Sequence, residues 1–200
     1  MNALLAALLS LTLAAPAAAA RPAGAATTVL ELSGGALTVG ERSLQVGDRL
    51  PDGKSARLAR GGRLVLRAGP WGKILLHGPA VFAAGGEDGA DGLRLKAGGL
   101  LAVLHKVKGR VFGVRTPAAA LAVRGTTFYT ETRGQTAQYL CICDGAVELL
   151  TPSGAFKATV SSEKTHKSYL FQFHDDNGLQ SEAPMERHND EEIAALAAPR

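Results

Sequence analysis

The apolar positions of this chain fall in short runs, which glycine, aspartate and proline separate between about residues 29 and 160. Runs of β-prone residues bounded by such turn signals are typical of strands. The 24 glycines agree with this interpretation, because tight turns need glycine and helix interiors disfavour it. The pattern predicts strands at residues 29–32, 36–39, 56–59, 63–67, 72–76, 79–83, 92–96, 99–104, 110–115, 119–123, 126–131, 136–143, 146–150 and 155–160.

Many short strands at this spacing indicate an all-β fold, and we expect a sandwich, a jelly roll or a short β-solenoid. The chain has 200 residues and is 46% apolar, which is enough for one sizeable core. We therefore expect one principal β domain at residues 29–160.

The regular pattern of short β-prone runs ends at about residue 160, and we place a C-terminal extension at residues 161–200. One more alternating strand is predicted at residues 167–173. The segment NDEEIAALAA, residues 189–198, predicts a short helix. Asn189 is a good N-cap, and Glu192 lies three residues further on, as in a capping box.

The first twenty residues form an apolar run that ends in small residues, with an A-x-A pattern at Ala18 and Ala20. This pattern predicts a signal peptide at residues 1–20, followed by a linker at residues 21–28. An uncleaved membrane anchor is the alternative, because about 18 apolar residues can just span a bilayer. After cleavage we expect a periplasmic or secreted protein with no transmembrane helix.

The segment VFGVRTPAAALAVRGTTFYTE, which starts at Val111, is followed by a Gly-containing stretch around Gly145. It closely resembles the signature of the FecR domain, and the resemblance extends over about residues 44–154. It implies a periplasmic β domain used in sensing and signalling. Iron-citrate signalling is not carried over, because we recognise neither a cytoplasmic segment nor a transporter-contacting domain. The matching signature positions are Thr116, Pro117, Ala119, Val123, Arg124, Gly125, Thr126, Phe128 and Gly145.

Three signature residues also have a direct physical interpretation. Pro117 cannot donate to a sheet ladder, so it should break or begin a strand. Gly125 permits a bulge or a close backbone approach that a side chain would block. Arg124 is either a buried pin paired with a carboxylate or a ligand-binding guanidinium, and we favour the pin.

The only cysteines, Cys141 and Cys143, lie in a predicted hairpin at residues 136–150, with its turn at Asp144–Gly145. Side chains alternate between the two faces of a strand. The family's apolar positions map to Leu140, Ile142, Val147 and Leu149, which leaves both cysteines on the opposite face. Residues two apart have α-carbons about 6.5–7 Å apart, so a mutual disulfide would be strained. Two thiolates at this separation can instead share a metal ion.

The C-terminal extension is rich in further ligands, and it either covers the cysteine face or leaves it free. Two of its histidines would complete a tetrahedral Cys₂His₂ set suited to zinc, whereas the Met185 thioether would favour copper. Disulfide or redox chemistry and two inert buried thiols remain the alternatives. The candidate metal ligands are Cys141, Cys143, His166, His174 and His188, with Met185.

Charge and composition narrow the remaining function classes. The net charge is +4, and the arginines around the predicted hairpin of residues 56–67 offer a contact for anionic glycans, although a solvated strand face is the plainer explanation. An exported chain with 5% aromatic residues is a poor nucleic-acid binder. His174 with Ser161 or Ser162 could be a hydrolase set, but no G-x-S-x-G motif accompanies it. The arginines are Arg57, Arg60, Arg63 and Arg67.

The sequence therefore predicts a non-enzymatic module in the cell envelope, which senses or binds a ligand or contacts another envelope protein. The alternative is a zinc- or copper-binding protein, or a thiol redox protein, that uses the two cysteines and the C-terminal histidines.

Overall fold

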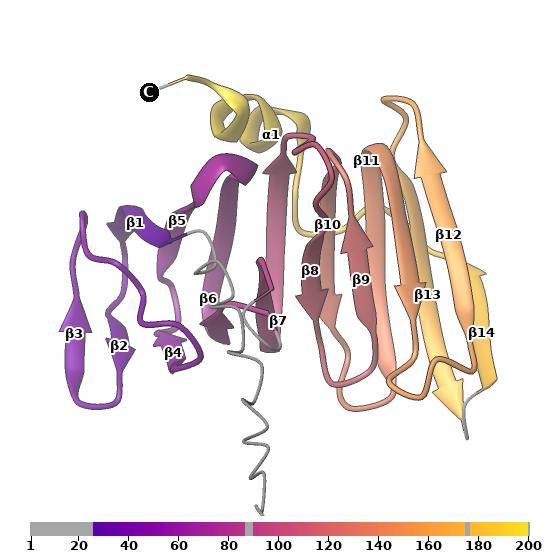
Figure 1. Ribbon diagram of the computed structural model, residues 1–200, viewed down its shortest axis with the longest axis horizontal. Coiled ribbons are helices and arrows are strands. Elements are labelled where there is room, and N and C mark those ends of the chain that lie inside the picture. The colour runs from indigo at the N-terminus through magenta and orange to yellow at the C-terminus, as the bar shows by residue number, and fades with distance from the viewer. Residues whose placement is uncertain (1–25, 87–89, 175–176, 200) are drawn as a thin grey trace, which may run out of the picture.

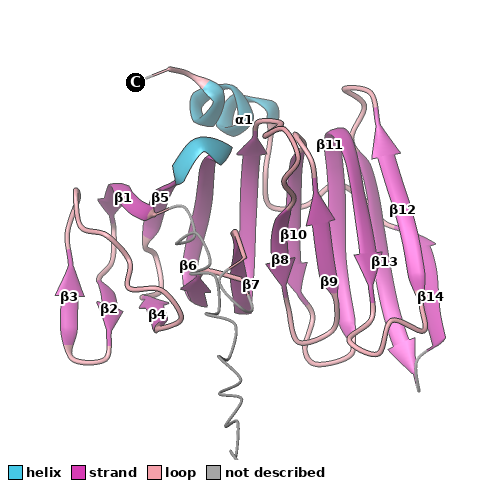
Figure 2. Ribbon diagram, in the orientation of Figure 1, coloured by secondary structure: helices cyan, strands magenta, loops and turns pink. Residues whose placement is uncertain are grey.

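The computed structural model describes residues 26–86, 90–174 and 177–199, which form strands and one short helix (Figure 1, Figure 2). The predicted signal peptide lies outside the described residues, as does most of the predicted linker. The elements are β1 (Thr27–Ser33), β2 (Leu37–Val39), β3 (Arg42–Leu44), β4 (Ser55–Leu58), β5 (Arg63–Ala68), a 3-10 turn (Gly69–Trp71), β6 (Gly72–Ala84), β7 (Gly92–Leu104), β8 (Phe112–Arg115), β9 (Ala120–Val123), β10 (Thr127–Thr132), β11 (Ala137–Leu150), β12 (Lys157–Ser162), β13 (Lys167–His174), β14 (Asn177–Glu182) and α1 (Asp190–Ala197).

The described strands form one hydrogen-bonded network, and its centre is a closed ring in the order β7-β8-β9-β11-β10. The ring closes because the long strands β7 and β11 each pair with two different strands on the same edge. Strands β1 to β6 extend the network from β7, and β12 to β14 extend it from β11 (Figure 1). The mainly β class and the short C-terminal helix are confirmed, whereas the sandwich, jelly-roll or solenoid arrangement is not confirmed.

Several predicted strands merge into longer ones. Residues 72–76 and 79–83 both belong to β6, and residues 92–96 and 99–104 both belong to β7. The breaks in the pattern mark an irregularity rather than a turn, because the β6–β7 register shifts between His77 and Val81. The predicted hairpin of residues 56–67 is wrong, since β4 and β5 pair with different parts of β6.

Strand β11 has two distinct faces. Leu140, Ile142, Val147 and Leu149 are fully buried in the main apolar core, as the pattern predicts. Tyr139, Cys141 and Cys143 belong to a second, smaller buried cluster on the opposite face. The alternation of side chains along a strand accounts for both assignments.

The predicted turn at Asp144–Gly145 is wrong, because β11 continues through it as one strand. Thr127 pairs with Asp144 and Phe128 with Ile142, so Cys143 is an extra residue in a β-bulge. Gly145 has a φ of 96°, which a residue with a side chain adopts only with strain. The bulge shifts the alternation by one residue, which keeps Ile142 and Val147 on the same face although they are five positions apart.

The C-terminal extension is an integral part of the sheet rather than a free tail. Strand β13 pairs with β11, and an additional strand, β14, pairs with β13. Helix α1 begins as predicted, because the Asn189 side chain accepts a hydrogen bond from the Glu192 backbone N–H at 2.9 Å. The helix contacts β6 and β7. Among the described residues, no helix is both long and apolar enough to cross a membrane.

Candidate metal centre and adjoining groove

Strand β11 supplies the two sulfur atoms of the candidate site. Cys141 is fully buried and Cys143 is 4% exposed, and both thiols are free. Ser168 of β13 lies directly opposite Cys141 in the sheet. If the register is extended by one residue, His166 lies opposite Cys143, just before β13 begins. The pairing of β11 with β13 therefore explains how a histidine 25 residues from Cys141 in sequence reaches the cysteines.

The second histidine comes from the segment between β14 and α1. Tyr139 holds this segment, because its hydroxyl donates to the Pro184 carbonyl at 2.9 Å and accepts from the Glu186 N–H at 3.0 Å. Arg187 has a φ of 58°, a conformation that turns the chain at the residue before His188. The His188 side chain is then buried, and its ring stacks on Tyr129 with centroids 4.9 Å apart.

These residues form one compact cluster of potential ligands. Cys141 Sγ lies 3.7 Å from His166 Nδ1, and Cys143 Sγ lies 3.5 Å from His188 Nε2. All four ligand atoms lie within 4.8 Å of one another. Thiolate and imidazole groups are the ligands that zinc prefers in four-coordinate sites, and they also suit copper.

Each histidine of the cluster has its second ring nitrogen occupied. His188 Nδ1 lies 2.7 Å from the Glu186 carbonyl oxygen, which can only accept a hydrogen bond. The proton of the neutral ring is therefore on Nδ1, and the Nε2 lone pair faces Cys143. His166 Nε2 lies 2.8 Å from the Asp190 carboxylate, which leaves the Nδ1 lone pair toward Cys141. Such partners orient the histidines of metal sites.

The contacts within the cluster also change its proton affinities. The hydrogen bond from Cys143 lowers the pKa of Cys141, and the same interaction raises the pKa of Cys143 together with burial. The pair therefore loses its first proton from Cys141. Burial alone would lower the pKa of His166, but the hydrogen bonds to Asp190 and Cys141 outweigh it and raise the pKa.

The other candidate ligands are not part of this cluster. His174 is exposed at the far end of β13, about 20 Å from Ser168 at 3.3 Å per residue. Met185 is 47% exposed, unlike the buried cysteines. The hydrolase arrangement is not assembled, because Ser162 hydrogen-bonds Thr165 near the start of β13 and His174 lies at its other end.

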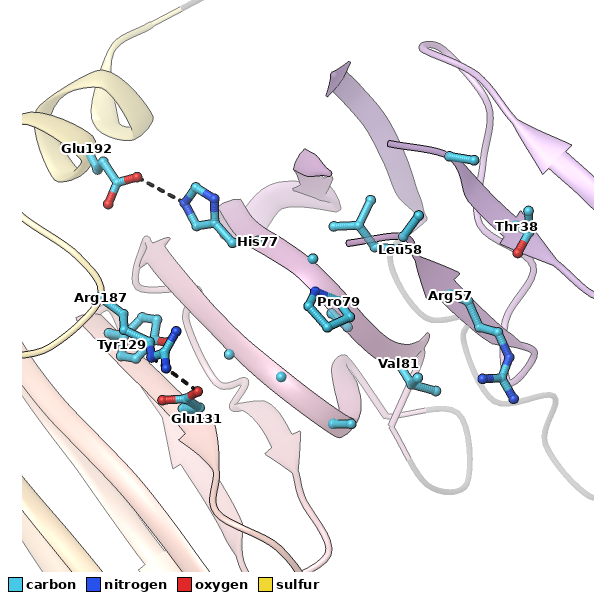
Figure 3. Close-up of a pocket in the computed structure, with 17 residues that line it drawn as sticks. Thr38, Arg57, Leu58, His77, Pro79, Val81, Tyr129, Glu131, Arg187 and Glu192 are labelled. Carbon is cyan, nitrogen blue, oxygen red and sulfur yellow. Dashed lines mark hydrogen bonds and ion pairs between the residues drawn. The ribbon is translucent and has the colours of Figure 1, made fainter. Parts of the chain in front are cut away.

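A groove of about 940 Å³ adjoins the cluster, because Tyr129, whose ring stacks on His188, is one of its lining residues. Figure 3 shows the residues that line this groove. Its floor consists of small residues where β6 and β7 lose their regular register, including Gly78, Pro79, Gly98 and Gly99. The absence of side chains leaves this part of the sheet hollow. A Cβ atom on Gly99 would lie only 2.2 Å from the Tyr129 hydroxyl oxygen.

The two ends of the groove are charged. Arg57 lies at one end, exposed, and no ion pair is found for it among the described residues. At the other end, Arg187 Nε lies 3.5 Å from Glu131, and His77 lies 3.0 Å from Glu192 of α1 (Figure 3). Tyr129 lines the groove and also stacks on His188, so the groove and the cluster share a wall.

Solved structures with the same fold support the class of this domain. Two crystal structures of a candidate anti-sigma factor from Parabacteroides distasonis ATCC 8503 match with a TM-score of 0.52, at 13% and 14% sequence identity. The match covers 64% of this chain and 59% of theirs, so this chain spans about three fifths of their length. At this identity the likeness shows the fold alone.

The sequence identifies the family. It matches the profile of the FecR protein family over residues 45–148, slightly more than half of the chain. The chain therefore belongs to the FecR family, which confirms the resemblance seen in its signature. A comparison with curated proteins finds no match.

The signature residues have structural roles in this fold. The Thr116 hydroxyl and the Ala119 backbone hydrogen-bond each other at 3.0 Å and close the turn that contains Pro117. Gly125 has a φ of 64°, and a Cβ there would lie 2.9 Å from Lys106. The prediction that Arg124 is a buried pin is wrong, because its side chain is exposed. The remaining signature side chains, Ala119, Val123, Thr126 and Phe128, are buried.

Sequence reasoning missed three contributors to the site. Asp190 falls within the predicted helix, and its contact with His166 has no signal in the sequence. Tyr129 gave no signal beyond its place in a strand. The groove had a usable signal, since the Gly78–Pro79 step and the Gly98–Gly99 pair interrupt two strand patterns at corresponding positions.

Proposed function

We propose that this chain is an exported, non-enzymatic module of the cell envelope that senses or binds a ligand or a partner protein. The observation that carries the proposal is the open groove on a FecR-family domain, with a floor of small residues and charged ends. The likeness to a candidate anti-sigma factor supports a role in signalling. Regulation of a sigma factor itself is not part of the proposal.

Export rests on the apolar segment of residues 1–20. Expression of the full chain in a Gram-negative host, followed by fractionation and intact-mass measurement, tests it. We expect a periplasmic protein whose mass corresponds to cleavage after Ala20. A full-length chain that stays in the cytoplasm would contradict export. It would not contradict ligand binding at the groove, which is tested separately.

Ligand binding at the groove predicts a specific dependence on Arg57. A thermal-shift screen of the full chain against small organic anions, such as mono- and dicarboxylates, should find compounds that raise the Tm. Arg57→Gln should abolish the shift, whereas Arg60→Gln, an exposed arginine outside the groove lining, should keep it. Equal shifts in both variants would place the binding elsewhere.

Anionic glycans are an alternative partner, although the arginines do not form one patch. Arg57 lies at the groove, and Arg63 is half buried and 2.6 Å from Glu31. Arg67 lies on β5, beside a smaller depression. Salt-sensitive retention of the chain on heparin, lost in Arg57→Gln and Arg67→Gln together, would favour this partner over a small ligand.

The second candidate function is metal binding or thiol redox chemistry at Cys141 and Cys143. The convergence of two histidine lone pairs on the two sulfurs favours it. Elemental analysis with thiol titration before and after chelation separates the two chemistries. Thiols that react only after chelation indicate a metal site, and thiols that cycle with glutathione without metal indicate redox function.

A further inference from the structure

We propose that Cys141, Cys143, His166 and His188 bind one Zn²⁺ ion, and that this ion fixes residues 183–199 against the sheet, where they form one wall of the groove. The inference goes beyond the sensing role and does not depend on export or on the identity of the groove ligand. It rests on the geometry of the cluster and on the path of the C-terminal segment.

The distances within the cluster match a tetrahedral zinc site. With Zn–S bonds near 2.3 Å and Zn–N bonds near 2.05 Å, a tetrahedral angle places sulfur and nitrogen about 3.6 Å apart. Two of the four sulfur–nitrogen separations of the cluster are 3.7 and 3.5 Å, and all four ligand atoms lie within 4.8 Å of one another. Zinc can therefore be accommodated with small side-chain adjustments.

The directions of the lone pairs add an independent argument. In both histidines the nitrogen that faces a sulfur is the one left without a proton in the neutral ring. A carboxylate behind one metal-binding histidine and a backbone carbonyl behind the other are the usual supports of zinc sites.

The composition of the cluster favours zinc and a structural role. Four protein ligands fill a tetrahedron and leave no position for substrate, as in structural zinc sites. Two imidazoles with two thiolates suit zinc, whereas copper(I) favours softer sets that contain thioethers. The Met185 thioether, which would have favoured copper, is half exposed.

The ion would connect three separate parts of the chain. Cys141 and Cys143 belong to β11, His166 to the β12–β13 connection, and His188 to the segment before α1. Arg187, next to His188, contributes to the groove wall, and α1 follows directly with Glu192 in the same wall. Without the ion this segment is held by surface ion pairs, the Tyr139 hydrogen bonds, a backbone hydrogen bond from the Ala183 N–H to the Ser168 carbonyl, the stacking of His188 on Tyr129 and the apolar contacts of α1. The ion would add a direct connection from this segment to β11, so metal binding should determine how firmly the wall is held.

The first experiment measures metal binding by the purified full chain. We expect one equivalent of zinc by elemental analysis and, after replacement with Co²⁺, the thiolate charge-transfer and intense d–d bands of a tetrahedral site. His188→Ala should lower zinc affinity at least 100-fold, and His174→Ala, an exposed histidine of the same extension, should leave it unchanged. Circular dichroism checks whether each variant is folded. If His188→Ala does not fold, Cys143→Ser serves as the second test of the site.

The proposed site would be overturned if the chain bound no zinc, or if it bound only copper(I) tightly. It would also be overturned if both His188→Ala and Cys143→Ser still bound zinc. Asp190→Asn tests the supporting contact to His166 and should weaken zinc affinity about 10–100-fold. Glu191→Gln, which removes a neighbouring charge of the same helix turn, is its matched control.

The second experiment measures the C-terminal segment by hydrogen exchange and by trypsin cleavage after Arg187. Chelation of the wild-type chain should increase exchange in residues 183–197 at least tenfold and expose the Arg187 site, while β11 residues on the core face stay protected. Addition of zinc should reverse both effects. Zinc binding without a change in exchange or cleavage would overturn the fixing of the segment while leaving the metal site intact.

Discussion

The two faces of β11 are both buried, but they are covered in different ways. On one face, Leu140, Ile142, Val147 and Leu149 pack against neighbouring strands in an aliphatic and aromatic core. On the other face, the cysteines and two tyrosines are covered by residues 183–199, which hold this face with polar contacts and two apolar side chains of α1. Burial by neighbouring strands is part of the fold itself, whereas burial by a terminal segment can be reversed.

The largest difference between the faces should appear on truncation of the core face. Ile142→Ala leaves a cavity among fully buried side chains and should lower the free energy of unfolding by about 2–5 kcal/mol. Urea unfolding should show this loss equally with zinc and with chelator. Glu148→Gln, an exposed change on the same strand, should stay within about 0.5 kcal/mol. A loss that depended on zinc would mean that the two faces are not independent.

The opposite face should contribute stability only through its ligand. Free zinc at 100 times its Kd should stabilise the wild-type chain by about 2.7 kcal/mol, because only the folded state offers the complete site. Cys143→Ser should remove this increment in unfolding experiments. Ile142→Ala should retain it, and its absence there would show that damage to the core also disrupts the site.

The bulge that separates the two halves of β11 should have an intermediate effect. Gly145→Ala places a side chain at a φ of 96° and 3.0 Å from the Gly125 carbonyl oxygen. We expect a loss of about 1–3 kcal/mol, from the strained conformation and the close contact. Gly134→Ala has a similar φ but nothing within 4 Å, so it should cost less. Equal losses would show that the close contact at Gly145 is relieved by relaxation.

The smallest expected effect concerns pH. Burial, followed by the charge of Glu131, raises the pKa of Tyr129 above its ordinary value. The folded state therefore retains this proton when the unfolded chain begins to lose it near pH 10, and stability falls as the pH rises further. The free energy of unfolding should be measured in chelator between pH 8 and 11. In Tyr129→Phe it should fall less steeply with pH than in the wild-type chain, by at most about 1.4 kcal/mol per pH unit. Tyr169→Phe is the control, and an identical slope in Tyr129→Phe would contradict the assignment.

The sequence correctly predicted which side chains lie on each face of β11, but it did not predict that β11 continues as one strand through Asp144 and Gly145. Alternation of side chains is a local property, so the division between Leu140 and Cys141 followed from the family's apolar positions. The Asp144–Gly145 pair was interpreted as a turn because the same positive φ serves both a hairpin and a bulge. Only the pairing with β10 and β12 distinguishes these two cases, and that pairing is not local.

The candidate metal ligands were predicted as a set from which two histidines had to be chosen. His166 follows from the β11–β13 register, and His174 is excluded because it lies six residues further along the same strand than Ser168. His188 depends on a bend at Arg187 with a positive φ, for which a non-glycine residue gives no local signal. To predict the groove from the sequence, one would have to know that two interrupted strands lie side by side, as β6 and β7 do.

The position of His188 has a mechanical consequence. A pulling force applied to the C-terminus would first meet α1, whose few apolar contacts with the sheet can separate one after another. At His188 the force would pass through the ion to β11, a central strand that pairs with β9, β10, β12 and β13 and must shear many hydrogen bonds at once. Metal occupancy would thus set how far along the chain tension can unravel this protein.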